Sequence, residues 1–418
     1  MQNAPDITPR GEHLAFLEVL GSMRADDARW TPTMAGFVTV RLVDKWAESL
    51  RGWLAPRPSE VAAVRSAIDK VAASPVRNAL TGIVDAITQT WGQPRAVVSA
   101  RVLAYAALLY DEEACALASD VYRTFLSFAS TDSDQELRAH AWVRLGTSLV
   151  MGGHLKEGQA AHEAGREMAA HGGQRYLELL AEHGLAIVAM QRGNLPDADA
   201  RLGALADTCR TEMVDDPSLG DIFARALHDR GWVAMQRHDI DRGFGLFHDA
   251  MRHAPDPRRK DRVLHDLATA FADSGDRLTA CKVMRMIEQQ SGEQRLRWTA
   301  ALNLMHYATL DGSETVFEHY RRALASAALE PRLQVHYHMF VGEGCRRFGR
   351  EAQAVAAYTR AITVGERYSL NQLVMEAEET KNAKPVPVET ERTEVRPTWS
   401  PEAERVARAI DEMVGAGA

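Results

Sequence analysis

His336, His338 and Cys345 are the residues of this chain whose types come closest to a metal-binding set. Imidazole nitrogen and thiolate sulfur are ligands that zinc prefers, and a site needs three or four ligands around the ion. On a helix, side chains two positions apart point in different directions, so His336 and His338 cannot hold one ion together. No third or fourth ligand stands at a suitable spacing. We therefore predict no metal site and expect ordinary surface and groove histidines.

Catalytic chemistry usually has a local signature, and the common ones are missing from this sequence. There is no phosphate loop G-x-x-x-x-G-K-[ST], no nucleophile elbow G-x-S-x-G and no zinc helix H-E-x-x-H. Gly342, Gly344 and Gly349 superficially suggest a phosphate loop, but they lie in and after a predicted helix, where close packing explains them. The carboxylates Glu343 and Asp273 are too weak a basis for a catalytic pair. We predict a protein that is not an enzyme and uses no cofactor.

The bulk properties are those of a folded protein with mixed charges. The chain has 418 residues, of which 46% are hydrophobic and 25% charged, and its net charge is -8. This length exceeds the roughly 250–300 residues at which a single core stops growing, so the chain must divide into domains or extend as repeats. The negative charge disfavours direct binding to nucleic acid, which we expect only through a partner or a local basic patch.

The sequence also indicates a compartment. The four cysteines lie far apart, which argues against a disulfide framework and for a reducing environment. The first twenty residues show no basic and apolar segments of a secretory signal. The longest apolar stretch, Ala96–Leu109, is interrupted by polar residues and falls short of the roughly 20 residues that span a bilayer. We predict a cytoplasmic protein that does not enter a membrane.

The elements that must position any binding residues are helices. From about Arg95 to Leu370, apolar residues recur at helical spacing between short turns that carry Gly, Asp or Asn. Alternating runs of the strand type are almost missing, and no two of them flank an Asn-Gly or Asp-Gly turn. The sequence therefore predicts an all-α fold.

A repeated spacing is the most informative feature of these helices. Gly342 is followed by Gly349, Ala354, Tyr358 and Ala361 at intervals of seven, five, four and three residues. The same register recurs at Gly231, His238, Gly243, Phe247, Ala250 and Pro255; at Ala268, Gly275, Ala280, Met284 and Ile287; at Ala186, Gly193, Ala198, Leu202 and Leu205; and at Gly146, Gly153, Gly158 and Gly165. Small residues allow two helices to approach closely, and a large residue fills the gap to the neighbour. With two looser units, at 96–129 and 298–327, seven helical pairs are predicted.

This spacing resembles that of the tetratricopeptide repeat (TPR) family. The resemblance covers about two-thirds of the chain and implies a right-handed α-solenoid of antiparallel helix pairs. The distances between successive turns are about 36 to 45 residues, where the family period is 34. We therefore expect a divergent array with long repeats, similar to those of bacterial regulator and sensor proteins.

Four segments follow from this reading. Residues 1–92 form helices without repeat spacing, which we interpret as an N-terminal capping segment or interaction module. Residues 93–380 form the TPR-like repeat array. Residues 381–399 form a Pro-rich charged linker. Residues 400–418 form a short amphipathic helix that folds back, binds another subunit or frays.

The resemblance also implies where a partner binds, because proteins of this family use the first helix of each pair to line a groove. The corresponding residues are Arg225, His228, Trp232, Arg262, His265, Trp298, His336, Met339, Glu343, Arg346 and Arg347. Aromatic, methionine and basic side chains suit recognition of a peptide or helix. The alternative is that Trp232 and Trp298 only pack between helices. The family's Lys and Asn clamp for a terminal carboxylate is not predicted, because other residues stand at its positions.

The predicted function is a protein–protein interaction scaffold or adaptor, which binds a peptide or helix in its groove. The alternative is a TPR-type sensor or transcription-regulatory protein that responds to a peptide or small molecule. Arg41, Lys45 and Arg51 are too sparse to decide whether the N-terminal helices bind DNA. A homo-oligomer is left open, as are the partner's identity and the pathway.

Overall fold

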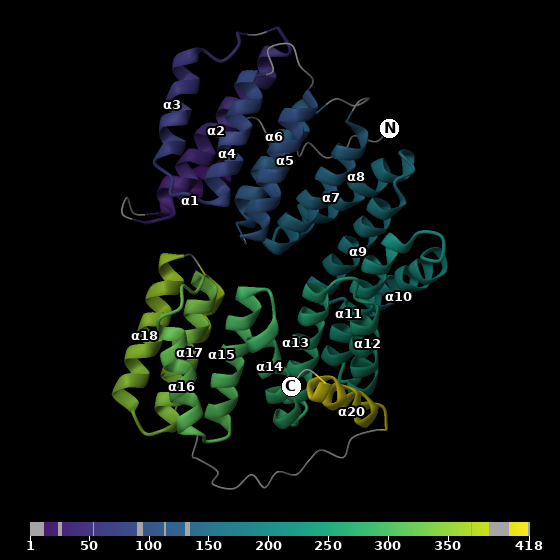
Figure 1. Ribbon diagram of the computed structural model, residues 1–418, viewed down its shortest axis with the longest axis vertical. Helices are drawn as coiled ribbons and strands as arrows, with labels where there is room; N and C mark the ends of the chain where they lie inside the picture. Colours follow the sequence, from purple (N-terminus) through teal and green to yellow (C-terminus); the bar gives the residue numbers. More distant parts are fainter. Residues whose placement is uncertain are drawn as a thin grey trace. The chain divides into compact units, whose positions relative to one another are not determined.

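The computed structural model describes residues 12–23, 27–52, 54–89, 95–112, 114–129, 134–368, 370–383 and 401–416. Within these residues the protein is all-α, with twenty α-helices, one short 3-10 helix and no strand. The chain divides into two compact units, Met1–Leu205 and Ala206–Ala418, which are described separately (Figure 1). The predicted all-α fold is confirmed.

The first unit begins with four helices that precede the repeats. They are α1 (Leu14–Ser22), α2 (Trp30–Ser49), α3 (Pro58–Asp69) and α4 (Pro75–Gln89). α1 and α2 both pack on α6, the second helix of the first repeat. Phe16 of α1 and Tyr105 and Phe125 of the first repeat are at most 1% exposed and share one core. These four helices are therefore continuous with the core of the repeats that follow.

Fourteen described helices fall into seven consecutive pairs. They are α5 (Arg95–Asp111) and α6 (Cys115–Phe128), α7 (Gln135–Met151) and α8 (Leu155–His171), α9 (Arg175–Gln191) and α10 (Leu195–Glu212), α11 (Gly220–Gln236) and α12 (Ile240–His253), α13 (Pro257–Asp273) and α14 (Arg277–Gln290), α15 (Gln294–Leu310) and α16 (Glu314–Ala325), and α17 (Pro331–Arg347) and α18 (Glu351–Arg367). From α11 to α17, the first helices of successive pairs begin 37 residues apart, at residues 220, 257, 294 and 331. This interval lies at the lower end of the predicted range.

The packing within pairs explains the repeated spacing. A Cβ atom on Gly231 would lie 2.8 Å from the ring of Phe247, sixteen residues further along, and one on Gly342 would lie 2.7 Å from the ring of Tyr358. Real Cβ contacts are not this short, so each ring occupies the space that the missing side chain leaves. The small residue on the first helix and the large residue on the second are thus one packing unit.

The turn between the two helices of a pair uses backbone in the left-handed region. One residue of this turn has a positive φ in six of the pairs: Gly153 (83°), Gly193 (76°), His238 (61°), Gly275 (98°), Gly312 (71°) and Gly349 (74°). In all of these pairs except that of Gly312, it stands seven positions after the small residue of the first helix. Glycine adopts this conformation without the steric penalty that other residues meet. His238 is the one non-glycine residue among these six.

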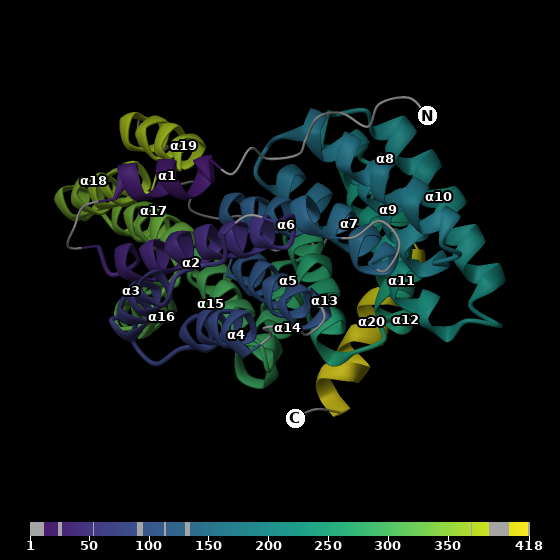
Figure 2. The same cartoon turned by 90° about the horizontal axis from the view of Figure 1, so that it is seen from above.

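Two helices follow the last pair. α19 (Asn371–Asn382) packs on α17 and α18, where Leu373 and Ala377 join the core. α20 (Pro401–Ala416) packs on α12 and α14 (Figure 2). Most of the predicted linker, from residue 384 to residue 399, lies outside the described residues. The four predicted segment boundaries stay predictions.

Candidate functional site

The predicted groove residues all lie on α11, α13, α15 and α17, the first helices of four successive pairs in the second unit. Three of the contacts between side chains of these helices follow one another from α11 to α17. We call the eight residues involved the first-helix row: His228, Trp232, His265, Asp266, Asn303, His306, Phe340 and Glu343. Four of them, His228, Trp232, His265 and Glu343, are in the predicted set.

The first contact joins α11 to α13 through the carboxylate of Asp266. His228 Nε2 lies 2.8 Å from Asp266 Oδ2, and Trp232 Nε1 donates to the same oxygen over 3.2 Å. The indole also packs edge-on against Phe247, with ring centroids 5.9 Å apart. Trp232 is therefore a packing residue, as in the alternative interpretation, and a hydrogen-bond donor at the same time.

The second contact continues from α13 to α15. His265 Nδ1 lies 3.0 Å from Asp266 Oδ1, and Asn303 Nδ2 donates to His265 Nε2 over 3.1 Å. Because Asn303 donates to Nε2, the proton of His265 must be on Nδ1, where it is donated to Asp266. One carboxylate thus accepts from three side chains and orients a second histidine.

The charges in this network follow from burial and from the carboxylate. Burial alone would raise the pKa of Asp266, but the hydrogen bonds from His228 and His265 hold that pKa well below its usual value. Burial would likewise lower the pKa of His228, yet the Asp266 carboxylate, with Asp229 nearby, raises it above its ordinary value. His228 and Asp266 therefore form a charge-assisted pair that is only partly exposed, at 14% and 25% of their side chains.

The third contact joins α15 to α17. His306 Nδ1 lies 3.0 Å from Glu343 Oε2, and the imidazole stacks on Phe340 with centroids 4.6 Å apart. The ring of His336 also lies near Phe340, with centroids 6.2 Å apart. Burial and the nearby Arg332 lower the pKa of His336, so this imidazole is neutral at pH 7. This end of the row offers an aromatic surface beside one carboxylate.

The predicted arginines on α11 and α13 lie at the start of their helices and pair with acidic residues. Arg225 Nε donates to Asp221 over 2.8 Å, and Arg262 contacts Glu293 with two nitrogens, at 3.1 and 2.9 Å. Arg259 also lies 3.4 Å from Asp221. These three arginines thus belong to ion pairs near the N-terminal ends of α11, α13 and α15.

The remaining predicted residues are placed differently. Met339 is 3% exposed and packs with Val335 and Leu373 in the core under α19, so it does not line a surface. Arg346 donates to the carbonyl oxygens of Thr380 and Lys381 at the end of α19. Trp298 and Arg347 are half-buried, and neither is part of the row contacts.

Sequence reasoning missed Asp266, Asn303, His306 and Phe340. A signal for three of them exists, since the row contacts join residues 38, 38 and 37 positions apart: His228 with Asp266, His265 with Asn303, and His306 with Glu343. This separation matches the 37-residue interval between first helices. Polar residues that recur at the repeat period therefore indicate contacts between neighbouring first helices.

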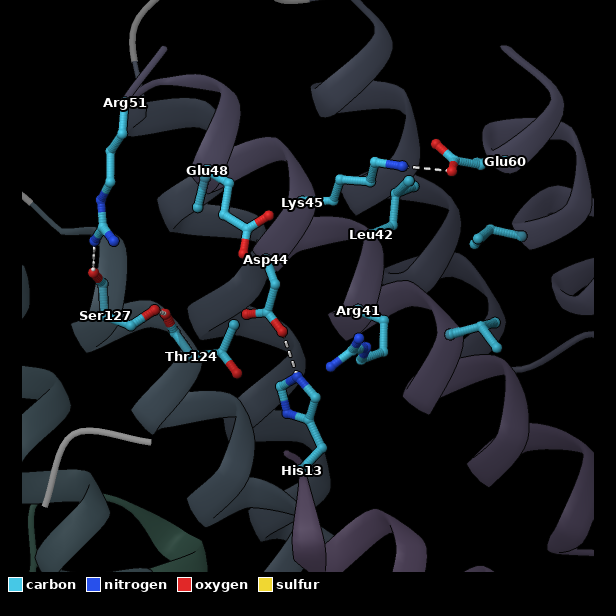
Figure 3. Close-up of a pocket in the computed structure, with 13 residues that line it drawn as sticks. His13, Arg41, Leu42, Asp44, Lys45, Glu48, Arg51, Glu60, Thr124 and Ser127 are labelled. Carbon is cyan, nitrogen blue, oxygen red and sulfur yellow. Dashed lines mark hydrogen bonds and ion pairs between the residues drawn. The ribbon is translucent and has the colours of Figure 1, made fainter. Parts of the chain in front are cut away.

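A separate pocket of about 490 Å³ lies in the first unit, between α1, α2, α3 and α6 (Figure 3). His13 is 3% exposed, and its Nε2 lies 2.6 Å from Asp44 Oδ2. Glu48, one turn further along α2, lines the same pocket (Figure 3).

Basic residues line the same pocket. Lys45 pairs with Glu60, and Arg51 donates to the carbonyl oxygen of Ser127 over 2.6 Å. Arg41 also lines it. The wall of the pocket thus contains three carboxylates and three basic residues, Arg41, Lys45 and Arg51. These are the three basic residues that are too sparse in the sequence to decide on DNA binding.

Two kinds of feature, a metal-binding group and a membrane-spanning helix, are missing from the described residues. No group of three or more His, Cys, Asp or Glu among them is arranged to hold a metal ion. None of the described helices combines the length and the apolar character that crossing a membrane requires.

The chain was compared with known proteins. No family model matches it, and neither does any curated protein. Among solved structures, it is similar to the crystal structure of a Rap protein complexed with Competence and Sporulation Factor. The TM-score is 0.50 and the identity 11%, and the match covers 81% of this chain and 98% of that chain. At this identity the likeness shows the fold alone: the chain is an all-α protein with a TPR-like helical-repeat fold, as predicted.

Proposed function

We propose that the protein is a non-catalytic scaffold that binds a peptide or a helix of a partner protein along the first-helix row. The observation that carries this proposal is the continuous set of polar and aromatic contacts across α11, α13, α15 and α17. Its side chains are held in place by one another but remain partly exposed, at 14% for His265, 28% for His306 and 29% for Glu343.

Such an arrangement is suited to binding because it is preorganised. Side chains that are already fixed lose little conformational freedom when a partner docks. Two polar groups of the row also keep hydrogen-bonding capacity: Glu343 Oε1 and the amide oxygen of Asn303 are additional acceptors. The aromatic faces of Trp232 and Phe340 supply apolar area beside them. A partner segment that carries amide donors and apolar side chains would meet hydrogen-bond acceptors and aromatic faces along the row.

The similar Rap protein supports the proposal that this chain binds a partner, because it is complexed with Competence and Sporulation Factor. A fold of this type is thus found in complex with a factor. The partner of the present chain follows from the row's chemistry and not from that protein, since the identity between the two is only 11%.

The test is comparative capture of partners from lysate, followed by affinity measurement with the captured partner. The variants are Asn303→Ala and Glu343→Gln, which change half-buried polar groups on α15 and α17. The matched control is Arg322→Ala on α16, a second helix, where the side chain is 77% exposed. We expect the wild type and the control to bind the partner equally and the two row variants to bind at least about tenfold more weakly, a loss of about 1.4 kcal/mol each. Equal binding by all four proteins would show that the first-helix row is not the binding surface.

The pocket of the first unit favours a second candidate function, a sensor of a small molecule. Its volume of about 490 Å³ lies within the roughly 300–1,000 Å³ typical of ligand sites. Asp44 and Glu48 both line this pocket, one turn apart on α2, and carboxylates in a pocket suit an amine. We expect a cationic metabolite to raise the melting temperature of the wild type and not that of an Asp44→Asn, Glu48→Gln variant. A metabolite panel without any such compound would argue against this function.

A further inference from the structure

α20 is an amphipathic helix whose apolar side is covered by the second unit. Ala403, Val406 and Ile410 are all 0% exposed. They stand three and four positions apart, so they form one stripe along the helix. This stripe packs on α12 and α14, the second helices of two neighbouring pairs (Figure 2). The contact therefore lies on different helices from the first-helix row.

One ion pair borders the apolar contact. Lys282 Nζ of α14 lies 2.6 Å from Asp411 Oδ1 of α20. The two side chains are 36% and 50% exposed, so water and salt screen the attraction. A pair of this kind contributes little to affinity but fixes the direction and register in which a helix docks.

The docked helix has sixteen residues. A helix of this length is marginally stable alone in water, so α20 gains its stability from docking. Among its described contacts, three fully buried apolar side chains and one partly exposed ion pair stabilise the docked helix, and the ordering of the helix opposes them. Residues 384–400 separate it from α19 in sequence, and this tether keeps its local concentration high. Docking is therefore an equilibrium that a competing helix can shift.

We propose that the face of α12 and α14 beside Lys282 is a binding site for an amphipathic helix, and that α20 occupies it as a tethered, displaceable ligand. The partner that fits this site is a helix with the pattern of α20. It carries a small residue, aliphatic residues three and seven positions after it, and a carboxylate eight positions after it. While α20 is docked the site is closed to such a partner.

The test uses the full-length chain and a fluorescein-labelled peptide with the sequence of residues 401–416. The variant Val406→Asp, Ile410→Asp places two charges in the buried stripe and releases α20. The matched control, Arg408→Asp, places one charge on the exposed side of the same helix. Fluorescence anisotropy should show that the peptide binds the released variant at least about tenfold more tightly than the wild type or the control, because the tethered helix no longer competes.

A charge exchange then locates the site. Adding Lys282→Glu to the released variant should weaken binding of the native peptide about two- to fivefold, the range of an exposed ion pair. A peptide with Asp411→Lys should bind this Lys282→Glu chain more tightly than the native peptide does. The proposal is overturned if the peptide binds the wild type and the released variant equally, if it binds neither, or if the exchanged charges do not restore affinity. Ile410→Asp alone replaces the double variant if circular dichroism shows a loss of fold.

Discussion

At the scale of single residues, His162 is the most unusual member of the repeat pattern. It stands sixteen positions after Gly146, where Phe247 and Tyr358 stand after Gly231 and Gly342. A Cβ on Gly146 would lie 2.8 Å from its ring, and one on Gly184 of α9 would lie 2.2 Å from it. The imidazole is 1% exposed, and its Nδ1 has no hydrogen-bond partner within the described residues. Burial, assisted by the neighbouring His183, lowers the pKa of His162 to about 4.

This burial predicts acid sensitivity. The unfolded chain takes up a proton at His162 near pH 6.5, whereas the folded chain does so only near pH 4. Stability from this group is therefore full above pH 6.5 and is lost as the pH falls. Between pH 7 and pH 5 the wild type should lose about 2 kcal/mol more than His162→Phe. Urea denaturation at both pH values measures this difference. His154→Phe, at an exposed position, should behave like the wild type; an equal loss in all three proteins would contradict the prediction.

The hydrogen bonds around Asp266 lead to a second prediction, which concerns a histidine whose pKa is raised. The carboxylate overcomes the effect of burial and raises the pKa of His228. In the variant Asp266→Asn only burial and the weaker influence of Asp229 remain, so the pKa of His228 should fall below its wild-type value. An NMR titration of the imidazole signals measures the shift directly. An unchanged pKa would show that Asp266 is not the group that holds the charge.

At the scale of helices, the pair of α11 and α12 has a close approach at one small residue. On α11, Gly231 faces Phe247 of α12, whereas a Cβ on Gly220 at the start of the same helix would meet nothing within 4 Å. The same substitution should therefore have different effects at the two positions.

Gly231→Ala should lower the free energy of unfolding by about 1–3 kcal/mol, because the new methyl group forces the phenylalanine ring to move. Gly220→Ala should be neutral or slightly stabilising, since alanine favours the helix. Urea denaturation of both variants provides the comparison. Adding Phe247→Leu should recover part of the loss in Gly231→Ala. Equal stabilities for the two alanine variants would argue against the close packing.

Arg346 connects two other helices, since it donates to the carbonyl oxygens at the end of α19 and its guanidinium lies 5.0 Å from the ring centroid of Tyr358. Arg346→Ala should leave these carbonyls without donors and weaken the docking of α19. Hydrogen exchange of residues 371–382 should become about tenfold faster, as expected for the loss of a charged hydrogen bond of about 1.5 kcal/mol. Arg347→Ala is the matched control and should leave the exchange unchanged.

At the scale of the whole molecule, the structure consists of two compact units, each built from neighbouring pairs. Most helix contacts join an element to the next one or two in sequence. Stability in such arrays is the sum of the pairs and of the contacts between neighbours, so damage stays close to its origin.

A local defect should therefore remain local. Gly342→Ala should speed hydrogen exchange in α15, α17, α18 and α19 and leave the helices of the first unit, such as α5–α8, unchanged. Mass spectrometry of exchanged peptides resolves these regions. Faster exchange throughout both units would show that the chain unfolds as one cooperative body instead.

Much of this architecture could be predicted from the sequence, because its determinants are local. The intervals between Gly342, Gly349 and Tyr358 depend on helix geometry within a single pair, and similar intervals identified four other pairs. Met339 illustrates the limit: its position on α17 is that of a groove residue in the repeat pattern, but α19 contributes to its surroundings.

The polar contacts between helices were harder to predict from the sequence. Asp266 acts through three donors on two helices, and no motif within α13 reveals them. The pocket of the first unit is even harder to predict, because His13 and Asp44 are 31 residues apart and meet only through the packing of α1 on α2. The contacts of this pocket follow from tertiary structure and leave no periodic signal in the sequence.

The constant interval of 37 residues from α11 to α17 bears on how such a protein evolves. Each row contact connects one pair only to its immediate neighbour, and the helices of successive pairs begin in equivalent positions. A tandem duplication of the DNA that encodes residues 257–293 would therefore add a pair that meets both neighbours with side chains already suited to them. Genes for chains of this type can lengthen or shorten by whole repeats, and natural selection can adjust the length of the binding surface without first inventing a new core.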